Sequence, residues 1–413
     1  MREMKDSGVE WIGEIPKEWK ICRLKNYAYI MNGADFKDIQ DDNGDYPVIG
    51  SGGEFDRATK YLYDGESVLL GRKGTIDKPR YINGTFWTVD TMYYTKIKDI
   101  GIAKYLYYLC TQIQFDYYQY GSAVPSMTQR DLNSVVFPLP EIVEQENIVN
   151  YLDSKCSKID EIIEKQQAII EKLKEYKISI ITEVVTKGLD YEADYKESGT
   201  EWLGKIPSHW QYLSFKNVLK ERNEKNFPVK TVERLSLSID KGVTLYSEKT
   251  TNLDRFKDDV SQYKLAHEGD FVLNSMNMIV GAVGISHYFG CVSPAYYTYY
   301  DNEEDHITAK YCDYLFHSKT VKKVLHSLGK GIMSIDRGDD RINTCRLKVS
   351  RTDLRALKIP VPPICEQREI VKYLQSKENL IDKTIADRNK AIDKLQEYKK
   401  CLIYEVVTGK KEV

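Results

Sequence analysis

The chain has 413 residues, of which 42% are hydrophobic and 30% are charged, a balance that excludes collagen-like, disulfide-rich and wholly disordered classes. No stretch approaches the roughly 18 apolar residues of a membrane-spanning helix, and the start lacks the apolar core of a signal peptide, so we expect a cytoplasmic protein without membrane contact. The net charge of −2 neither predicts nor excludes nucleic-acid binding, because a basic face can coexist with an acidic remainder.

The chain contains two copies of one arrangement. Residues 5–19, KDSGVEWIGEIPKEW, and residues 196–210, KESGTEWLGKIPSHW, are identical at nine of fifteen positions. A second pair, 137–155 and 359–377, shares the pattern EQxxIVxYL. The offset between copies is 191 residues for the first pair and 222 for the second, so the segment between them is 222 − 191 = 31 residues longer in the second copy. Each copy therefore has a shared opening, a variable segment and a shared closing segment.

The variable segments contain short stretches rich in β-branched and aromatic residues and bounded by glycine, which predicts short strands. These stretches are 46–53, 66–74 and 85–97 in the first copy and 270–275, 282–292 and 295–300 in the second. Each copy then has a helix-like stretch, 103–111 and 309–318. We expect two domains of the same mixed α/β fold that differ in their surface residues.

The closing segments follow a heptad pattern that predicts two long helices. The apolar positions are Leu152, Ile159, Ile163, Ile170, Leu173, Ile180 and Val184 in the first copy, and Leu374, Ile381, Ile385, Ile392, Leu395, Leu402 and Val406 in the second. Polar residues interrupt both seams at matched places, namely Cys156/Glu378, Gln166/Arg388 and Lys177/Lys399, where they either set the register or lie at the edges. The expected fold class is α+β: two similar mixed α/β domains joined by two long antiparallel coiled-coil helices, with an internal twofold pseudo-repeat.

No pattern in the sequence indicates catalysis or metal binding. The motifs HExxH, GxxxxGK[ST] and GxSxG do not occur, and all six histidines belong to the second copy, so a duplicated active site could not depend on histidine. The eight cysteines are scattered without a CxxC pair, which indicates reduced thiols and no structural zinc site. The glycine cluster at 50–53 favours a tight turn over a phosphate loop. The sequence therefore predicts a binding protein.

The strongest binding signal is the loop LLGRKGTIDKPRY, residues 69–81, where a predicted strand ends and basic residues follow. Lysine neutralises DNA phosphates, arginine can pair bidentately with guanine, and exposed loop amides can meet phosphate oxygens. The candidate DNA-binding residues here are Arg72, Lys73, Gly74, Thr75, Lys78 and Arg80, and the polar loop 121–132 adds Ser126, Thr128 and Arg130. A solvated charged loop is the alternative explanation.

In the second copy, the equivalent loop at 273–284 has no basic residue but offers amide side chains, which can pair with adenine. Positive charge is expected from the segment 329–351 instead. The candidate DNA-binding residues of this copy are Asn274, Ser275, Asn277, Lys330, Arg337 and Arg341. The lysines at 319, 322 and 323 are interpreted as a solvated helix face.

Together these features resemble the specificity subunit of a type I restriction–modification system. The resemblance rests on the opening SGVEWIGEIPKEW, the closing start P-L-P-x-I-x-E-Q-x-x-I, the E-Y-K…E-V-V-T end and the twofold repeat, and it covers essentially the whole chain. It implies target recognition domains at 1–140 and 191–362, each reading one half of a bipartite double-stranded DNA site. It also implies a central spacer helix at 141–190 and a C-terminal spacer helix at 363–413 that fix the gap.

The resemblance further implies partner subunits. Two modification subunits with S-adenosylmethionine-dependent methyltransferase chemistry would dock on the chain, and two ATP-driven restriction subunits would join them where the system restricts DNA. S-adenosylmethionine, ATP and Mg²⁺ are then expected in these partners, and no cofactor in this chain. Three alternatives remain at this point: the specificity subunit of a type II-like system, a coiled-coil scaffold without DNA recognition, and a hidden nuclease or methyltransferase.

Overall fold

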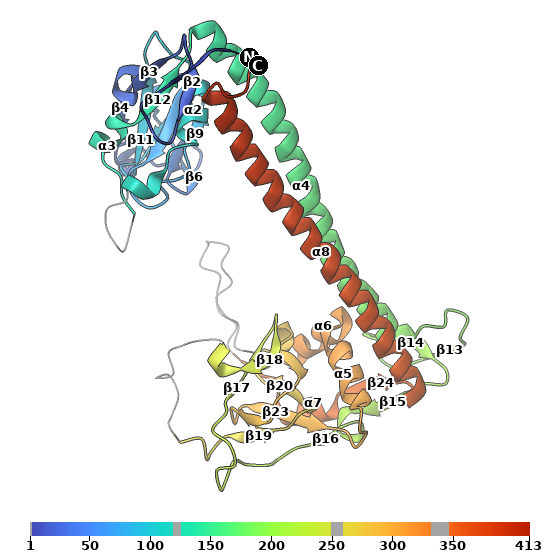
Figure 1. Ribbon diagram of the computed structural model, residues 1–413. Coiled ribbons are helices and arrows are strands. Elements are labelled where there is room, and N and C mark those ends of the chain that lie inside the picture. Colours follow the sequence, from blue (N-terminus) through green and yellow to red (C-terminus); the bar gives the residue numbers. More distant parts are fainter. Residues whose placement is uncertain (1, 119–124, 249–258, 332–346) are drawn as a thin grey trace. The chain divides into compact units, whose positions relative to one another are not determined.

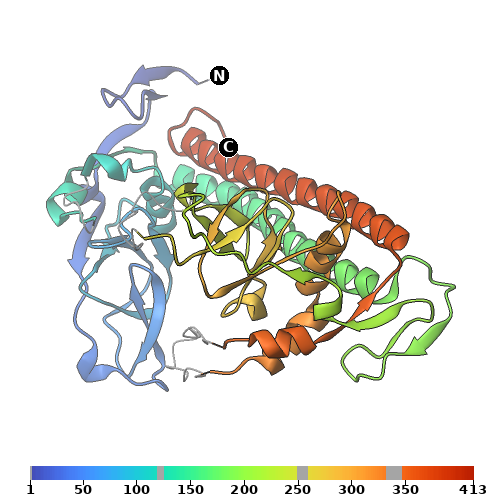
Figure 2. The same ribbon diagram turned by 90° about the horizontal axis from the view of Figure 1, so that it is seen from below.

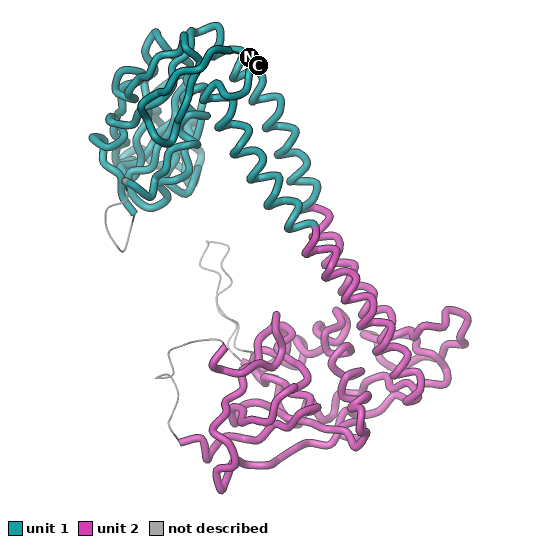
Figure 3. The backbone as a smooth tube through the Cα atoms, in the orientation of Figure 1, with its two compact units in different colours: residues 1–167, 388–413 teal, residues 168–387 magenta. Residues whose placement is uncertain are grey.

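The computed structural model describes residues 2–118, 125–248, 259–331 and 347–413. The chain forms two compact units: unit 1 comprises residues 1–167 and 388–413, and unit 2 comprises residues 168–387 (Figure 3). Each unit contains one α/β domain and parts of both long helices. Among the helices described, none is both long and apolar enough to cross a membrane.

The two long helices are α4 (Ile142–Lys187) and α8 (Ile364–Val407), and they lie side by side in both views (Figures 1 and 2). In unit 1, Lys399 Nζ donates to Asp160 Oδ1 at 2.6 Å. In unit 2, Lys177 Nζ donates to Asp382 Oδ2 at 2.9 Å. Because each contact joins the earlier part of one helix to the later part of the other, the helices are antiparallel, as the pseudo-twofold repeat predicts.

The apolar heptad positions of both helices are buried or partly buried, as a coiled-coil seam requires. Lys177 and Lys399 lie at the flanks of this seam, with 26% and 27% of their side chains exposed. Arg388 Nη1 donates to Gln166 Oε1 at 2.6 Å, so a third pair of polar positions also meets across the helices. Five of the six polar positions therefore pair with the opposite helix, and the sixth, Cys156, is buried.

Unit 1 contains two four-stranded sheets, in the orders β6-β5-β10-β7 and β4-β11-β8-β9, and the pairs β1-β2 and β12-β3. All of these strand pairs are antiparallel except β5–β10. The strands are β1 (Met4–Asp6), β2 (Glu14–Pro16), β3 (Lys20–Arg23), β4 (Ala28–Asn32), β5 (Tyr46–Gly50), β6 (Gly53–Ala58), β7 (Tyr63–Asp64), β8 (Ser67–Gly71), β9 (Arg80–Ile82), β10 (Thr85–Thr88), β11 (Met92–Ile97) and β12 (Val136–Leu139). The helices are α1 (Leu24–Tyr27), α2 (Ala103–Cys110) and α3 (Gln129–Ser134), with 3₁₀ turns η1 (Lys37–Ile39) and η2 (Phe115–Tyr118).

Unit 2 is built around the sheet β16-β23-β20-β21, with the pairs β13-β14, β15-β24, β17-β18 and β19-β22. Its strands are β13 (Tyr195–Glu197), β14 (Lys205–Pro207), β15 (Gln211–Ser214), β16 (Lys220–Glu221), β17 (Leu235–Ser238), β18 (Gly242–Leu245), β19 (Lys264–Ala266), β20 (Phe271–Asn274), β21 (Val283–Ile285), β22 (Gly290–Val292), β23 (Tyr296–Tyr300) and β24 (Lys358–Val361). Its helical elements are α5 (Ile307–His317), α6 (Lys319–Leu328), α7 (Arg351–Ala356), η3 (Phe215–Asn217), η4 (Tyr246–Glu248) and η6 (Met278–Val280).

Two of the expected strands are each divided in the structure. The stretch 85–97 forms β10 and β11, because Met92 N donates to Val89 O and turns the chain between them. The stretch 282–292 forms β21 and β22, which belong to different sheets. In the latter, Ser286 Oγ donates to Tyr288 O and stabilises the turn. The β-branched and aromatic composition continues through both turns, so it could not locate them.

The repeated sequence segments make the same contacts in both units. Trp19 Nε1 donates to Glu144 Oε2 at 2.8 Å, and Trp210 Nε1 donates to Glu366 Oε2 at 3.0 Å, which ties each opening hairpin to the start of a long helix. The hydroxyl of the buried Tyr311 donates to the carbonyl of Val185, in the last turn of α4, at 3.0 Å. In unit 1, Tyr105 makes the matching contact to Val407, in the last turn of α8. Each domain therefore holds the beginning of one long helix and the end of the other.

Glycine is required where each long helix ends. Gly188 and Gly409 have φ angles of +80° and +72°, the left-handed conformation that commonly ends helices. A Cβ on Gly409 would lie 2.4 Å from Pro16 Cδ, and a Cβ on Gly188 would lie 3.2 Å from Trp210 Cζ2. Both the backbone conformation and the close approach of the opening hairpin therefore exclude larger side chains.

Candidate nucleic-acid interface

The two candidate loops of unit 1 lie together. Gly74 N donates to Pro125 O at 3.0 Å, and Met127 N donates to Arg72 O at 3.1 Å. Lys73 and Ser126 form an isolated antiparallel bridge between these contacts. The loop after β8 is therefore fastened along its backbone to the segment before α3, and candidates that are about 50 residues apart in sequence form one surface.

The side chains of this surface differ in how free they are to contact DNA. Lys73, Lys78 and Arg130 are exposed. Arg72 is partly buried, and its Nη1 donates to Asp90 O at 3.2 Å. Arg80 Nη2 donates to Gly52 O at 3.1 Å, so this guanidinium ties β9 to the glycine-rich turn between β5 and β6.

Four candidates require a correction or a closer definition. The amide of Gly74 is already bonded to Pro125 and is not available to a phosphate, whereas Thr75 stays partly exposed. Thr128 is the N-cap of α3, where its hydroxyl accepts a hydrogen bond from Asp131 N at 3.2 Å and Asp131 reciprocates in a capping box. The hydroxyl of Thr128 therefore stabilises a helix start. Ser126 is partly exposed on the bridge to Lys73.

Unit 2 repeats this backbone arrangement. Val349 N donates to Ser275 O at 3.0 Å, which matches the bond from Met127 to Arg72, and Ser350 caps α7 by accepting from Asp353 N at 3.1 Å. The loop after β20 is thus the structural counterpart of the loop after β8, as the sequence predicts. In this arrangement, Ser275 occupies the place of Arg72.

The candidates of the second loop are placed differently from the expectation. Ser275 is fully buried beneath Val349, and Asn274 is only 7% exposed, with its Oδ1 accepting from Met276 N at 3.1 Å. Both side chains are buried, which corrects the expectation that the loop offers them at its surface. Asn277 is exposed on the turn that follows.

The basic candidates of the second copy fall into two groups. Lys330 is 77% exposed, and its Nζ lies 3.0 Å from Asp353 Oδ2. Arg337 and Arg341 lie outside the described residues. Within the described part of unit 2, the loop after β20 therefore displays Asn277 without a basic residue of its own.

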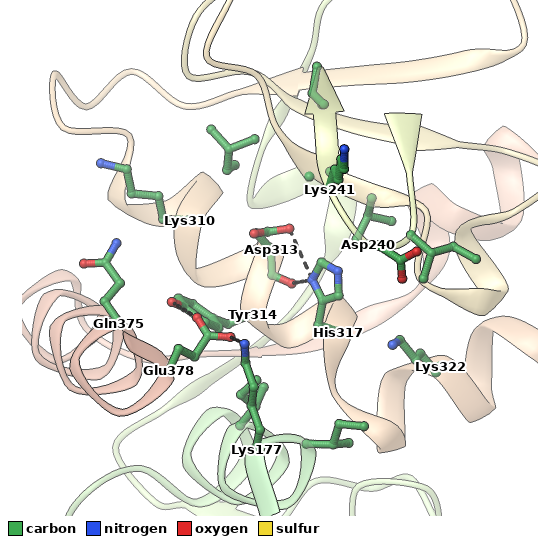
Figure 4. A pocket seen from close by; sticks show the side chains of 18 of the residues that line it. Lys177, Asp240, Lys241, Lys310, Asp313, Tyr314, His317, Lys322, Gln375 and Glu378 are labelled. Atoms are coloured by element: carbon green, nitrogen blue, oxygen red, sulfur yellow. Dashed lines mark hydrogen bonds and ion pairs between the residues drawn. The ribbon is translucent and has the colours of Figure 1, made fainter. Parts of the chain in front are cut away.

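Unit 2 also contains a pocket of about 470 Å³ between the long helices, α5 and the β17–β18 turn (Figure 4). Inside it, Lys177 pairs with Glu378 at 3.3 Å and His317 Nδ1 lies 3.3 Å from Asp313 Oδ1. Burial alone would lower the pKa of His317, but the hydrogen bonds and charge of Asp313 outweigh it, so the net pKa is raised. Within the ranges described, no group of three His, Cys, Asp or Glu residues could hold a metal ion. The pocket thus contains two charge pairs, and its lining also includes Lys310 and Lys322.

Comparison with known proteins identifies the family to which the chain belongs. Residues 16–175 and 207–394 match the family described as type I restriction modification DNA specificity domain. The chain belongs to this family. The two matched regions correspond to the two copies of the repeat, which confirms both the resemblance and the two-domain organisation predicted from the sequence.

The similar proteins include other specificity subunits. The type I restriction enzyme MjaVIII specificity subunit of Methanocaldococcus jannaschii is 23% identical over 438 residues, covering 96% of this chain and 93% of the relative. The EcoDI specificity subunit of Escherichia coli is 20% identical over 390 residues, covering 88% and 82%. These matches favour a specificity subunit, with catalysis in partner subunits, over a scaffold or a hidden enzyme.

A solved structure shows the same fold. It comes from work on the structural basis of complex assembly and conformational transition of the type I restriction–modification system. This structure and the present chain superpose with a TM-score of 0.66 at 14% sequence identity. The superposition covers 96% of this chain and 99% of the other. The α+β architecture with two long helices is therefore confirmed.

Proposed function

We propose that this specificity subunit reads a bipartite double-stranded DNA site, one half-site per recognition domain. The observation that carries the proposal is the matched loop arrangement: in both units a strand-end loop is fastened to the segment before a capped helix, at Arg72 and Met127 in one and Ser275 and Val349 in the other. Because the backbone is the same and the exposed side chains differ, the two units can present one framework to two sequences.

In the first domain, exposed Lys73, Lys78 and Arg130 are suited to phosphate oxygens. Arg72 is the candidate for base reading, since a guanidinium that donates to one carbonyl retains further N–H donors for guanine. In the second domain, the exposed amide of Asn277 is the candidate for adenine, and Lys330 could exchange Asp353 for a phosphate.

We assign the recognition domains to 1–140 and 191–362 and the spacer helices to 141–190 and 363–413, with the helices fixing the gap between half-sites. The subunit acts in the cytoplasm, where it meets DNA. It binds two modification subunits, which use S-adenosylmethionine, and in a restricting system two restriction subunits, which use ATP and Mg²⁺.

Matched surfaces on the long helices support the proposed stoichiometry of two. Tyr176 of α4 and Tyr398 of α8 are 222 positions apart in the repeat, and they are 51% and 54% exposed. Equivalent exposed aromatic side chains on both helices offer the same contact twice. A pseudo-twofold chain can therefore bind two copies of one partner without having a second copy of itself.

The test is single-molecule sequencing for N6-methyladenine in cells that express this chain with its adjacent modification gene. We expect a bipartite motif with a fixed gap that disappears when the chain is deleted. A matched control replaces residues 191–362 with the same region of another specificity subunit, which should change one half of the motif and leave the other intact. Methylation that persists without the chain, or a motif without two halves, contradicts the proposal.

A further inference from the structure

The two recognition loops differ in charge in a way that the shared fold does not explain. The loop after β8 displays Lys73 and Lys78, whereas the loop after β20 displays Met276 and Asn277. Phosphate neutralisation supplies most of the affinity of proteins for DNA, whichever bases are read. A second reader with the same framework therefore needs cations from another element.

Helix α6 is an element that unit 2 adds beside this loop. In the described part of unit 1, η2 is the sole helical element between α2 and α3. Ser318 caps α6 by accepting from Val321 N, and Lys319 N donates to Thr182 Oγ1 of α4 at 3.0 Å. Val321 and Leu325 are fully buried in the core of unit 2, so α6 is held firmly along one face.

The opposite face of α6 is basic. Lys319, Lys322, Lys323 and His326 are spaced i, i+3, i+4 and i+7, which places them together on the helix surface. Lys319, Lys323 and His326 are exposed. Among the described residues, no carboxylate pairs with the amine of Lys319, Lys322 or Lys323. Within the described residues, this row therefore presents amines whose charge no carboxylate neutralises.

This basic face lies next to the turn that follows Asn277. Helix α6 packs against η6, the single turn that follows Asn277. Gly281 ends that turn, and a Cβ on Gly281 would lie 2.9 Å from Lys322 Nζ. Because Ala282 N donates to Asn277 O at 3.0 Å, the turn carrying the exposed amide and the amine of Lys322 belong to one packed unit.

A groove of about 1120 Å³ runs between α6 and α4. Its lining combines the basic face with the hydroxyl-bearing residues Ser179, Thr182 and Thr186, and with two acids on α4, Glu175 and Glu183. Burial lowers the pKa of Lys322, so this ammonium is under-solvated in the free protein. An approaching anion would compensate for the lost hydration.

We propose that α6 is a phosphate-contact element of the second recognition domain, and that the DNA backbone beside the second half-site lies along Lys319 and Lys323 while Asn277 faces the bases. This proposal rests on the proposed function. Helix α6 would supply the basic residues that, in the first domain, belong to the loop after β8. The basic row, earlier interpreted as a solvated face, thereby becomes a binding surface.

The first experiment measures DNA affinity of the complete complex with modification subunits as a function of salt, on the target duplex found by methylation mapping. The variant is K319Q/K323Q, in which two exposed amines become neutral. Each lost phosphate contact should reduce the slope of log K against log salt by about 0.9, so we expect a reduction of about 1.8, and about eightfold weaker binding per contact at roughly 0.1 M salt. The control, K205Q/K383Q, removes the same charge from exposed positions on β14 and α8 and should leave the slope unchanged.

A second measurement places the contact on the DNA. Neutral methylphosphonate linkages beside the second half-site should weaken binding of the wild-type complex but add nothing to the loss in K319Q/K323Q, because the two changes remove the same interaction. The same linkages beside the first half-site should weaken both complexes equally. A wild-type slope in the variant, or additive losses at the second half-site, overturns the proposal.

Two other outcomes are distinguishable. If the variant fails to retain modification subunits in a pull-down while its salt slope is unchanged, the groove binds protein and the proposal is wrong. If the wild-type complex has no bipartite target, the proposed function itself fails, and the role of α6 fails with it.

Discussion

The contact between α5 and the end of α4 gives the most direct test of how each domain holds the long helices. Tyr311 is fully buried, and its hydroxyl oxygen lies 3.0 Å from Val185 O and 3.1 Å from Pro360 O, two carbonyls that share its single proton. Val185 lies in the last turn of α4, where carbonyls lack intrahelical partners. The substitution Tyr311→Phe therefore removes the one donor that these two carbonyls share, at a cost of about 1–3 kcal/mol.

For a unit of this size, that cost should lower the midpoint of thermal unfolding by about 2–12 °C. Burial raises the pKa of Tyr311 well above its usual value, so the hydroxyl stays protonated and the effect should be the same at about pH 7 and about pH 9. The assay is calorimetry of the full chain, with Tyr191→Phe as control, because Tyr191 is 70% exposed. If Tyr311→Phe shifts the midpoint no more than this control does, the hydroxyl does not secure the helix end.

Three further predictions concern charge and geometry. Since the pKa of His317 is raised, its pairing with Asp313 should stabilise unit 2 below about pH 6.5, and this stabilisation should be lost as pH rises through the folded-state pKa. Asp313→Asn should therefore lower the midpoint of thermal unfolding more at about pH 6 than at about pH 8. Equal losses at the two pH values would contradict this. Arg72→Ala should weaken target binding of the complex by about 1–3 kcal/mol if it reads a base, as measured by titration, and unchanged affinity would exclude that role. A heptad added to both α4 and α8 lengthens each by about 10 Å and should change the gap in the methylated motif but not its halves; altered half-sequences would refute a spacer.

The repeat made the architecture predictable. Identical residues at matched positions, such as Trp19 and Trp210, have matched partners in the structure, and the heptad positions are buried or partly buried as expected. Such features depend on local periodicity and on the duplication itself. Their prediction did not require knowledge of contacts between distant segments.

The contact surface was less predictable, because it depends on segments far apart in the chain. Ser275 is buried and accepts a backbone hydrogen bond from Val349, 74 positions later, and no local feature of the loop indicates this. Thr128 is different, since T-Q-R-D resembles the signature of a capped helix start and could have identified its structural role. For Lys323, the sequence correctly indicated an exposed helix face but not that the helix packs against the turn Met278–Val280.

Unit 1 is completed by residues 388–413, which determines the order in which the two units can fold. Residues 168–387 emerge from the ribosome as one continuous stretch, so unit 2 can complete its core during synthesis. Unit 1 begins to form earlier but is completed only after unit 2 has been made, because Tyr404 must donate to Trp11 O and Tyr105 must reach Val407. A prematurely terminated chain would thus carry a finished second reader and an open first one, so a truncated subunit could not direct its partners to a complete site.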